Sequence, residues 1–371
     1  MPSTRATIEA LHETAPAAPT HMLGRPRDHR GLHRLALTIV HRALPALPSR
    51  DLAEAPWHFL ADLFMNRSAR RLLRTADLVD LQWEEYGRLA PLIRKLAPNA
   101  ATTCMFHDVN EQKLSRAVDA AGDKESARKA LRDRARNRRL LRRAAPALDR
   151  GFVLSEKDRV LLDGCIPGLP SSVVPPPLVD DSTPLFDVGS RPPVVGFVAA
   201  LRRHENRDTA LRLATHIWPL VRAARPDARL RIIGGGLEEG PRAQLSGLPG
   251  VELTGFVDDL DEAYSGLRAT VSPIDRGAGV KFKVVESIVR GIPTLTTTVG
   301  AEGIDTDLFD LVSDDDHELA QGALDVLSDH DAAVRAHTAA LRARATYGVD
   351  RFVREYLSGV EDAITCRRSR V

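Results

Sequence analysis

Residues 268–304 read RATVSPIDRGAGVKFKVVESIVRGIPTLTTTVGAEGI and decide the fold. Ala269 to Ile274 is a short apolar run with β-branched residues, which predicts a buried strand, and the glycines after it predict a tight turn. From Val280 to Arg290 apolar residues recur at helical spacing, until a glycine and a proline end the helix. Thr294 to Val299 predicts a second strand. This order is typical of an α/β domain.

The glycine turn is a candidate anion site. A helix that begins after such a turn directs unpaired N–H groups, with roughly half a positive charge, at whatever lies before it. Lys281 and Lys283 add positive charge in the first turn of the helix, where the macrodipole disfavours cations. A bound anion would compensate for this charge. Glu286 shares a helical face with Lys283 and could bind ribose hydroxyls. The set predicts a nucleotide-diphosphate site, although an ordinary Lys283–Glu286 surface pair fits the same spacing.

Composition limits the possible classes. With 371 residues, 43% of them hydrophobic and 27% charged, the chain is long enough for two globular domains. A formal net charge of +2 gives no overall argument for nucleic acid as a partner. The three cysteines, Cys104, Cys165 and Cys366, have no disulfide or zinc spacing, which favours a reducing cytosol. No signal segment or long apolar stretch is present, so a cytoplasmic protein is expected.

A proline-rich segment, VVPPPLVDDSTPLFD from Val173 to Asp187, divides the chain. We therefore predict four parts: an N-terminal Rossmann-like domain (1–173), a linker (174–190), a C-terminal Rossmann-like domain (191–348) and a final helix that packs back on the first domain (349–371). After the linker, strands and helices alternate. The predicted strands are Val194–Ala199, Ala228–Ile233 and Val251–Thr254, and the predicted helices are Thr209–Ala224, ending near Trp218-Pro219 and Arg225-Pro226, and Leu260–Leu267.

The half before the linker is also predicted to be α/β. Strands are expected at Leu78–Leu81, Ala101–Phe106 and Phe152–Leu154, with a helix at Tyr86–Leu96. Ser155 is a candidate helix cap, with Asp158 at the third position of that helix. The first seventy residues contain helical segments such as Leu32–Leu44 but no clear leading strand, so this domain is expected to be shortened at its start.

Several short segments of the sequence follow one another in an order and at a spacing that can be compared with known families. They are PVVGFVAA with Asn206 soon after it, ARLRIIGGG, VELTGFVDDL, GAGVKFKVVESIVRGIPTLTT and GAEGI after the linker, and DLVDLQWEEYG, HDV and GFVLSEKDR before it. In order and spacing the chain resembles the GT-B glycosyltransferases, specifically the retaining family-4 type. The resemblance covers about residues 30 to 360 and implies two Rossmann-like domains facing each other across a cleft, with a nucleotide-sugar donor between them.

The resemblance also implies roles for individual residues. Glu286 matches the glutamate that contacts the donor ribose, and His107 matches a histidine near the scissile bond. With Lys283 these are the expected catalytic residues. The expected donor-binding residues are Arg202 and Arg203 toward the phosphates, Gly234 and Gly235 at a strand end, Phe256 and Val257 at the nucleobase, and Gly277, Ala278, Gly279, Val280 and Lys281 at the diphosphate.

The expected reaction moves a sugar with retention of configuration and without a metal or another cofactor. Negative charge grows on the leaving diphosphate, and Lys281, Lys283, Arg202 and a helix beginning at Val280 can stabilise it. We expect a front-face path without an obligatory nucleophile, and Asp108 is the residue to test against it. The pair Asp259 and Asp261 is interpreted as helix capping rather than metal binding. Asp314 to Asp316 is interpreted as a turn.

Two departures from the family pattern leave alternatives open. Ala278 stands where the family has the first of its paired glutamates, so the donor sugar is in question, and the usual leading strand with a glycine loop is missing from Met1 to Arg30. The chain could instead be a non-catalytic nucleotide-binding partner protein with this fold, or a nucleotide-sugar epimerase or hydrolase. The acceptor is unidentified.

A basic run from Arg128 to Arg143 has nine Arg or Lys residues against one Asp. Such a run is usually a solvated helix face. Its leucines also fit peripheral contact with an anionic membrane at the inner face, or with an anionic acceptor. Nucleic acid is not the expected partner, because no aromatic residues interleave with the arginines.

Overall fold

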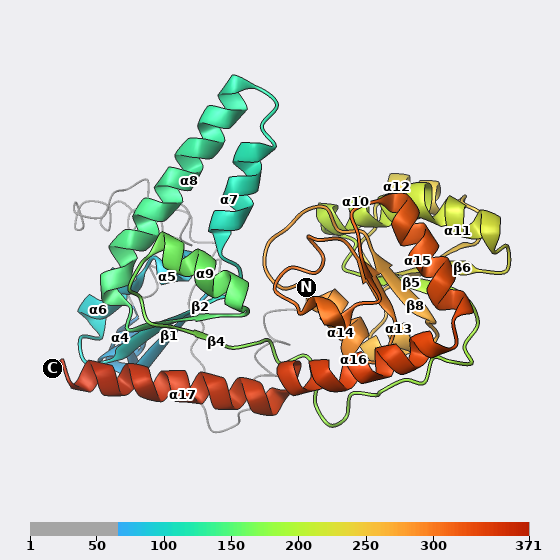
Figure 1. Cartoon of the computed structure of the whole chain (residues 1–371). Coiled ribbons are helices and arrows are strands. Elements are labelled where there is room, and N and C mark those ends of the chain that lie inside the picture. Colours follow the sequence, from blue (N-terminus) through green and yellow to red (C-terminus); the bar gives the residue numbers. More distant parts are fainter. Residues whose placement is uncertain (1–65, 371) are drawn as a thin grey trace.

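The computed structural model describes residues 66–370, which form two parallel sheets (Figure 1). The first has the order β1-β2-β3-β4, with β1 Leu78–Gln82, β2 Ala101–Phe106, β3 Arg150–Val153 and β4 Ser171–Val173. The second has the order β10-β9-β8-β5-β6-β7, with β5 Val194–Val198, β6 Arg229–Ile233, β7 Val251–Gly255, β8 Ala269–Ser272, β9 Thr294–Thr296 and β10 Leu311–Val312. The predicted α/β class with two Rossmann-like sheets is confirmed.

Helices pack around the first sheet. They are α4 Arg67–Thr75, α5 Glu84–Gly87, α6 Ala90–Leu96, α7 Asn110–Asp119, α8 Lys124–Ala144 and α9 Glu156–Cys165. The predicted helix Tyr86–Leu96 is therefore two helices, α5 and α6. Helices α7 and α8 pack together as a hairpin that projects well beyond the sheet (Figure 1). Ser155 caps α9 as predicted, because its Oγ accepts a hydrogen bond from the Asp158 N–H at 3.2 Å.

The second sheet carries its own helices. They are α10 His204–Arg212, α11 Trp218–Ala224, α12 Glu239–Ser246, α13 Leu260–Ser265, α14 Phe282–Val289 and α15 Asp316–Ser328. The prediction that Trp218-Pro219 marks a helix end is wrong. A π-helical turn at Leu213–Ile217 links α10 to α11, and Pro219 lies in the first turn of α11, where its missing N–H costs nothing.

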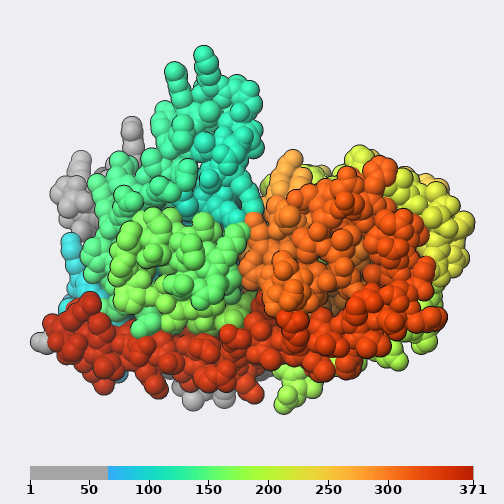
Figure 2. Space-filling model, viewed as in Figure 1, coloured from blue at the N-terminus to red at the C-terminus, as the bar shows by residue number. Residues whose placement is uncertain are grey.

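The last two helices connect the domains. Helix α16 (Asp331–Tyr347) packs on α14, and α17 (Val349–Arg368) crosses to the other sheet and contacts β2, β3 and β4. The aromatic rings of Phe152 on β3 and Tyr356 on α17 lie 5.0 Å apart. Figure 2 shows this pair of helices as one continuous ridge along the lower side of both domains. The final helix thus covers the N-terminal sheet.

Each domain has its own apolar core, and a third cluster joins them. Met105 and Phe152 of the first sheet pack in one cluster with Val280 and Val284 of the second domain and with Tyr347 at the end of α16. The domain contact is therefore partly apolar. This cluster packs the first sheet against the second domain.

Some predicted boundaries differ from the structure. The helix expected from Val280 begins at Phe282, and Lys281 is its N-cap residue. Strands β4 and β10 were not predicted. The predicted helix Leu32–Leu44 and the missing leading strand lie outside the described residues.

Candidate functional site

The glycine turn after β8 reaches the other domain. Gly277 has a φ of +119° and Gly279 a φ of +67°, conformations that favour glycine. A Cβ added at Gly279 would lie 2.0 Å from Asp108 Oδ1 and 3.3 Å from the His107 carbonyl oxygen. Both of these residues follow β2 in the N-terminal domain. The structure therefore brings the predicted phosphate turn against the predicted catalytic histidine.

His107 is held in place by two neighbours. Its Nε2 atom lies 2.8 Å from Gln82 Oε1, and its ring lies 4.3 Å from the ring of Trp83. Burial lowers the pKa of His107, although the nearby carboxylate of Asp80 acts in the opposite direction. The imidazole is therefore expected to be neutral at pH 7. A neutral ring can accept or donate a single hydrogen bond to a sugar hydroxyl.

Asp108 is a largely buried carboxyl whose pKa is raised. Burial raises its pKa to about 6, a shift that Lys281 opposes. Asp158 also raises the pKa of Asp108, whereas Arg203 and Lys113 lower it. The prediction that no enzyme nucleophile is used is not tested by this arrangement. The structure does place Asp108 beside the glycine turn.

Lys283 is the buried cation of the site. Its Nζ atom donates a hydrogen bond to Asn206 Oδ1 at 2.7 Å and lies 5.9 Å from the centroid of the Phe197 ring. Burial, together with the positive charges of Lys281 and Arg203, lowers its pKa to about 8. Asn206 is itself fixed by a hydrogen bond to the Ala200 carbonyl oxygen at 3.0 Å. Asn206 is therefore a site residue that the sequence pattern alone does not predict.

Glu286 lies one turn further along α14 and is not an ordinary surface residue. Burial raises its pKa, and Arg290, the Tyr264 hydroxyl and Lys283 oppose that rise. Because Lys283 has its hydrogen bond with Asn206, the simple Lys283–Glu286 surface pair does not describe the structure. A half-buried carboxylate at this position can accept hydrogen bonds from two vicinal hydroxyls.

Lys281 does not extend toward an open phosphate position in this structure. Its Nζ atom donates to the carbonyl oxygens of Ala278 at 3.1 Å and Gly279 at 2.7 Å. It also lies 3.7 Å from Glu302 Oε2. The ammonium group therefore stabilises the glycine turn from within.

Glu302, in the GAEGI phrase, gathers cations from both domains. Arg116 of α7 pairs with it and also donates to the Gly277 carbonyl oxygen. Lys157 Nζ lies 2.8 Å from Glu302 Oε1, and Gln112 Nε2 donates to the same oxygen at 2.8 Å. Burial, the largest single effect, raises the pKa of Glu302, but the hydrogen bonds and positive charges around it together outweigh burial. The net result is a lowered pKa. The cluster could not be predicted from the sequence, because its members lie far apart in the chain.

The other predicted donor residues line the neighbouring strand ends. Gly234 has a φ of +144°, and a Cβ there would lie 1.8 Å from the Ala199 carbonyl oxygen. Gly235 packs against the Cβ of Phe256, whose side chain is 76% exposed, and Val257 is half-buried. An exposed ring at the end of a parallel strand offers a stacking surface for a base.

The two arginines after β5 have different settings. Arg202 packs against Gly236, where an added Cβ would lie 2.6 Å from the Arg202 Cβ. Arg203 is the N-cap residue of α10, and its Nε lies 3.8 Å from Glu205 Oε2. Both side chains are exposed, so either can turn toward a ligand.

The acidic pairs act as helix caps. Asp259 accepts the N–H of Asp261 at 2.8 Å, and Asp261 pairs with Arg290 at 2.7 Å. Asp315 caps α15 in the same way. Within residues 66–370 no group of three or more His, Cys, Asp or Glu side chains is placed to hold a metal ion.

The basic run lies on α8. Arg134 and Arg138 both pair with Glu111 of α7 at 2.6 Å, so these two arginines brace the hairpin. The exposed remainder is Arg128, Lys129, Arg132, Arg139, Arg142 and Arg143. No helix within 66–370 is long and apolar enough to cross a membrane.

Two facing Rossmann-like domains with the glycine turn between them define the GT-B class of fold. Residues 192–329 match the family model described as "Glycosyl transferases group 1". This match covers the C-terminal domain, and the predicted resemblance to GT-B glycosyltransferases is confirmed. The retaining family-4 subtype stays a prediction.

Solved structures with similar folds have low sequence identity. S. aureus TarM is 13% identical, with a TM-score of 0.60 over 81% of this chain and 58% of that chain, so this chain spans less than two thirds of TarM. Sucrose-phosphate synthase from Thermosynechococcus elongatus is 18% identical, with a TM-score of 0.61 over 82% of this chain and 77% of that chain. Anabaena HepE, solved with UDP and glucose, is 13% identical, with a TM-score of 0.60 over 94% and 88%. No curated protein matches the sequence.

Proposed function

We propose that this chain transfers a sugar from a nucleotide-diphosphate sugar to an acceptor hydroxyl, with retention of configuration and without a metal ion. The observation that carries the proposal is the contact of Gly279 with Asp108 and the His107 carbonyl oxygen. The glycine turn of one domain thus meets the strand end of the other, which supports a donor bound between them. A donor held by the turn would have its sugar beside His107.

The donor nucleotide has a matching surface in the second domain. Phe256 can stack on the base, Glu286 can accept ribose hydroxyls, and the N–H groups at the start of α14 with Lys283 can bind the diphosphate. The structures of TarM and HepE named above contain UDP, which makes UDP the first nucleotide to test. The proposed donor is therefore a UDP-sugar.

In the proposed reaction the bond between the sugar C1 and the β-phosphate oxygen breaks, and a bond from C1 to the acceptor oxygen forms on the same face. The acceptor proton passes to the departing phosphate oxygen, so atoms and charge balance without an enzyme nucleophile. Lys283 and the N–H groups of α14 stabilise the charge that grows on the diphosphate. His107 orients the sugar through a hydroxyl.

Donor turnover in two variants tests this function. In Glu286→Ala and Lys283→Ala we expect turnover to fall by about a hundredfold or more, because each variant removes a charged contact to the donor. Glu262→Ala and Lys124→Ala change the same residue types at exposed positions and are the matched controls. Turnover is measured with and without EDTA. Full activity in both site variants would refute the proposal, and loss of activity with EDTA would refute the metal-independent part.

Ala278 favours a second candidate, a partner protein that binds a nucleotide without catalysis. It stands where the resembled family has a glutamate toward the donor sugar, so the sugar half of the site lacks that carboxylate. Calorimetry separates the two. UDP binding with no product from any acceptor, and no effect of His107→Ala, would support the partner protein. Product analysis without an acceptor would reveal an epimerase or a hydrolase.

The exposed basic residues of α8 support a peripheral contact with an anionic membrane surface. Six cations and the exposed Leu131 share one projecting helix, and each cation near such a surface contributes about 1 kcal/mol. Sedimentation with anionic vesicles is expected to fall with added salt and with Arg139→Ala combined with Arg142→Ala. Sedimentation that is insensitive to both changes would exclude this contact.

A further inference from the structure

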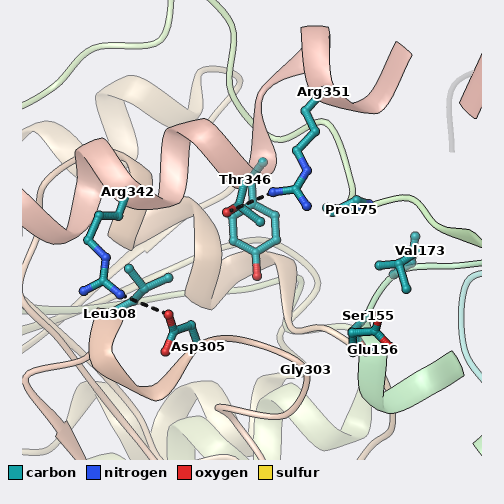
Figure 3. Close-up of a pocket in the computed structure, with 12 residues that line it drawn as sticks. Ser155, Glu156, Val173, Pro175, Gly303, Asp305, Leu308, Arg342, Thr346 and Arg351 are labelled. Atoms are coloured by element: carbon teal, nitrogen blue, oxygen red, sulfur yellow. Dashed lines mark hydrogen bonds and ion pairs between the residues drawn. The ribbon is translucent and has the colours of Figure 1, made fainter. Parts of the chain in front are cut away.

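A cavity of about 300 Å³ lies where the two domains and the connecting helices meet (Figure 3). Residues 154–156, between β3 and α9, and Val173 line it from the N-terminal domain, and Pro175 lines it from the linker. Residues of the loop from Gly303 to Leu308 line the other side. The end of α16 and the first turn of α17 close it. Both domains, the linker and the two connecting helices therefore border this cavity.

The cavity is separate from the proposed donor site. None of its lining residues is a candidate donor residue. Gly303 marks the division, because a Cβ there would lie 2.8 Å from Ser155 Oγ and 3.1 Å from a methyl carbon of Val280. The chain packs tightly at this point, between the glycine turn and the cavity.

One guanidinium in the cavity has no carboxylate partner among residues 66–370. Arg342 pairs with Asp305 at 3.1 Å, and Glu156 pairs with Arg159 at 2.6 Å, so these charges are balanced. Arg351 makes one polar contact within the described residues, with Thr346 Oγ1 at 3.5 Å. Figure 3 shows Arg351 reaching from α17 to this contact. Its half-buried guanidinium keeps most of its N–H donors for a ligand.

The remaining lining adds donors and apolar walls. Burial raises the pKa of Tyr347 to about 12, so its hydroxyl stays protonated. The first N–H groups of an α-helix have no partner within the helix, and at the start of α9 Ser155 Oγ accepts only the N–H of Asp158. Leu154, Val173 and Leu308 supply apolar surface. A small ligand with one anionic group and a compact body fits these walls.

We propose that this cavity binds a phosphate monoester of monosaccharide size, with Arg351 as its principal contact. A planar guanidinium whose N–H groups are mostly without a protein partner within residues 66–370 suits phosphate oxygens. The volume is at the lower end for small-molecule sites, which favours a sugar phosphate over a nucleotide sugar. The site does not depend on the proposed transferase activity.

Occupancy of the cavity has a consequence for the domains. A ligand in this cavity contacts Ser155 in the N-terminal domain, Leu308 in the C-terminal domain and Arg351 on α17 at the same time. It therefore stabilises the arrangement in which Gly279 meets Asp108. The proposed ligand thus favours the closed domain pair.

Isothermal titration of the full chain tests the site, with glucose 6-phosphate and inorganic phosphate as probes and glucose as the uncharged control. Arg351→Gln is expected to weaken glucose 6-phosphate binding by about tenfold or more, because it removes a charge-assisted contact. Arg354→Gln makes the same change at an exposed position of α17 and is expected to bind as the wild type does. Val173→Phe fills the cavity and keeps every charge, so it is expected to weaken binding as well.

Lys283→Met distinguishes this cavity from the donor site. It is expected to weaken UDP binding and leave glucose 6-phosphate binding unchanged. Loss of glucose 6-phosphate binding in Lys283→Met would place the phosphate at the glycine turn and overturn the proposal. No binding of either phosphate probe at millimolar concentration would overturn it, and so would equal binding in the wild type, Arg351→Gln and Val173→Phe. A loss of UDP binding alone bears on the proposed function and not on this cavity.

Discussion

Gly279→Ala is expected to impair closure of the domains more than it impairs folding. At a φ of +67° an alanine costs about 1 to 2 kcal/mol of backbone strain. The added Cβ would lie 2.0 Å from Asp108 Oδ1, so Asp108 or the turn must retreat by about 1.4 Å to restore ordinary contact. The retreat opens the contact that would hold the donor sugar beside His107. At about 1.4 kcal/mol per factor of ten, UDP affinity should fall about tenfold.

Calorimetric titration with UDP and urea denaturation measure the two effects separately. The matched control is Gly168→Ala, where φ is +82° but no atom lies within 4 Å of the added Cβ. Both variants are expected to lose similar stability, and only Gly279→Ala is expected to lose UDP affinity. Adding Asp108→Ala to Gly279→Ala should recover part of the affinity. Equal UDP binding by Gly279→Ala and Gly168→Ala would refute the role of this contact.

Three further changes test the electrostatics and the packing. Because the pKa of Lys283 is about 8, its ammonium group loses its proton as the pH rises through 8, and UDP affinity is expected to fall over that range. Calorimetric titrations between pH 7 and 9 measure this change. The Lys283→Met variant should not show it. Glu302→Gln leaves the surrounding cations without a carboxylate and should weaken the domain contact by about 1 to 3 kcal/mol. Small-angle scattering should then give a larger radius of gyration than for Glu262→Gln, and an unchanged radius would count against the cluster. Ser155→Ala removes the α9 cap and should lower the free energy of unfolding, measured by urea denaturation, by about 1 kcal/mol. An unchanged free energy of unfolding would contradict this prediction.

The local parts of the site could be predicted because their signals are local. Glycines after an apolar run gave the turn, and helical spacing gave α14 with Lys283 and Glu286 on it. Ser155 and Asp259 were recognised as caps because a cap and its N–H partner lie two or three residues apart. The helix start was placed two residues early, at Val280, since spacing does not fix the N-cap residue.

The contacts between domains could not be predicted. Glu302 and Arg116 lie 186 residues apart, and neither sits in a pattern that names the other. The orientation of Lys281 toward carbonyl oxygens depends on the turn conformation and not on residue type. Strands β4 and β10 have three and two residues, which are too few to show a period. Long-range pairing of charges needs the tertiary structure.

The crossing of α17 onto the first sheet affects the order in which the protein can be assembled during translation. Gly359 packs so closely on β3 that a Cβ there would lie 2.4 Å from Phe152, and the helix covers the sheet face around it. Ribosomes make this helix some two hundred residues after the strand it covers. The N-terminal sheet therefore lacks the cover of α17 while the whole second domain is synthesised, and of the two domains the one made earlier is completed later.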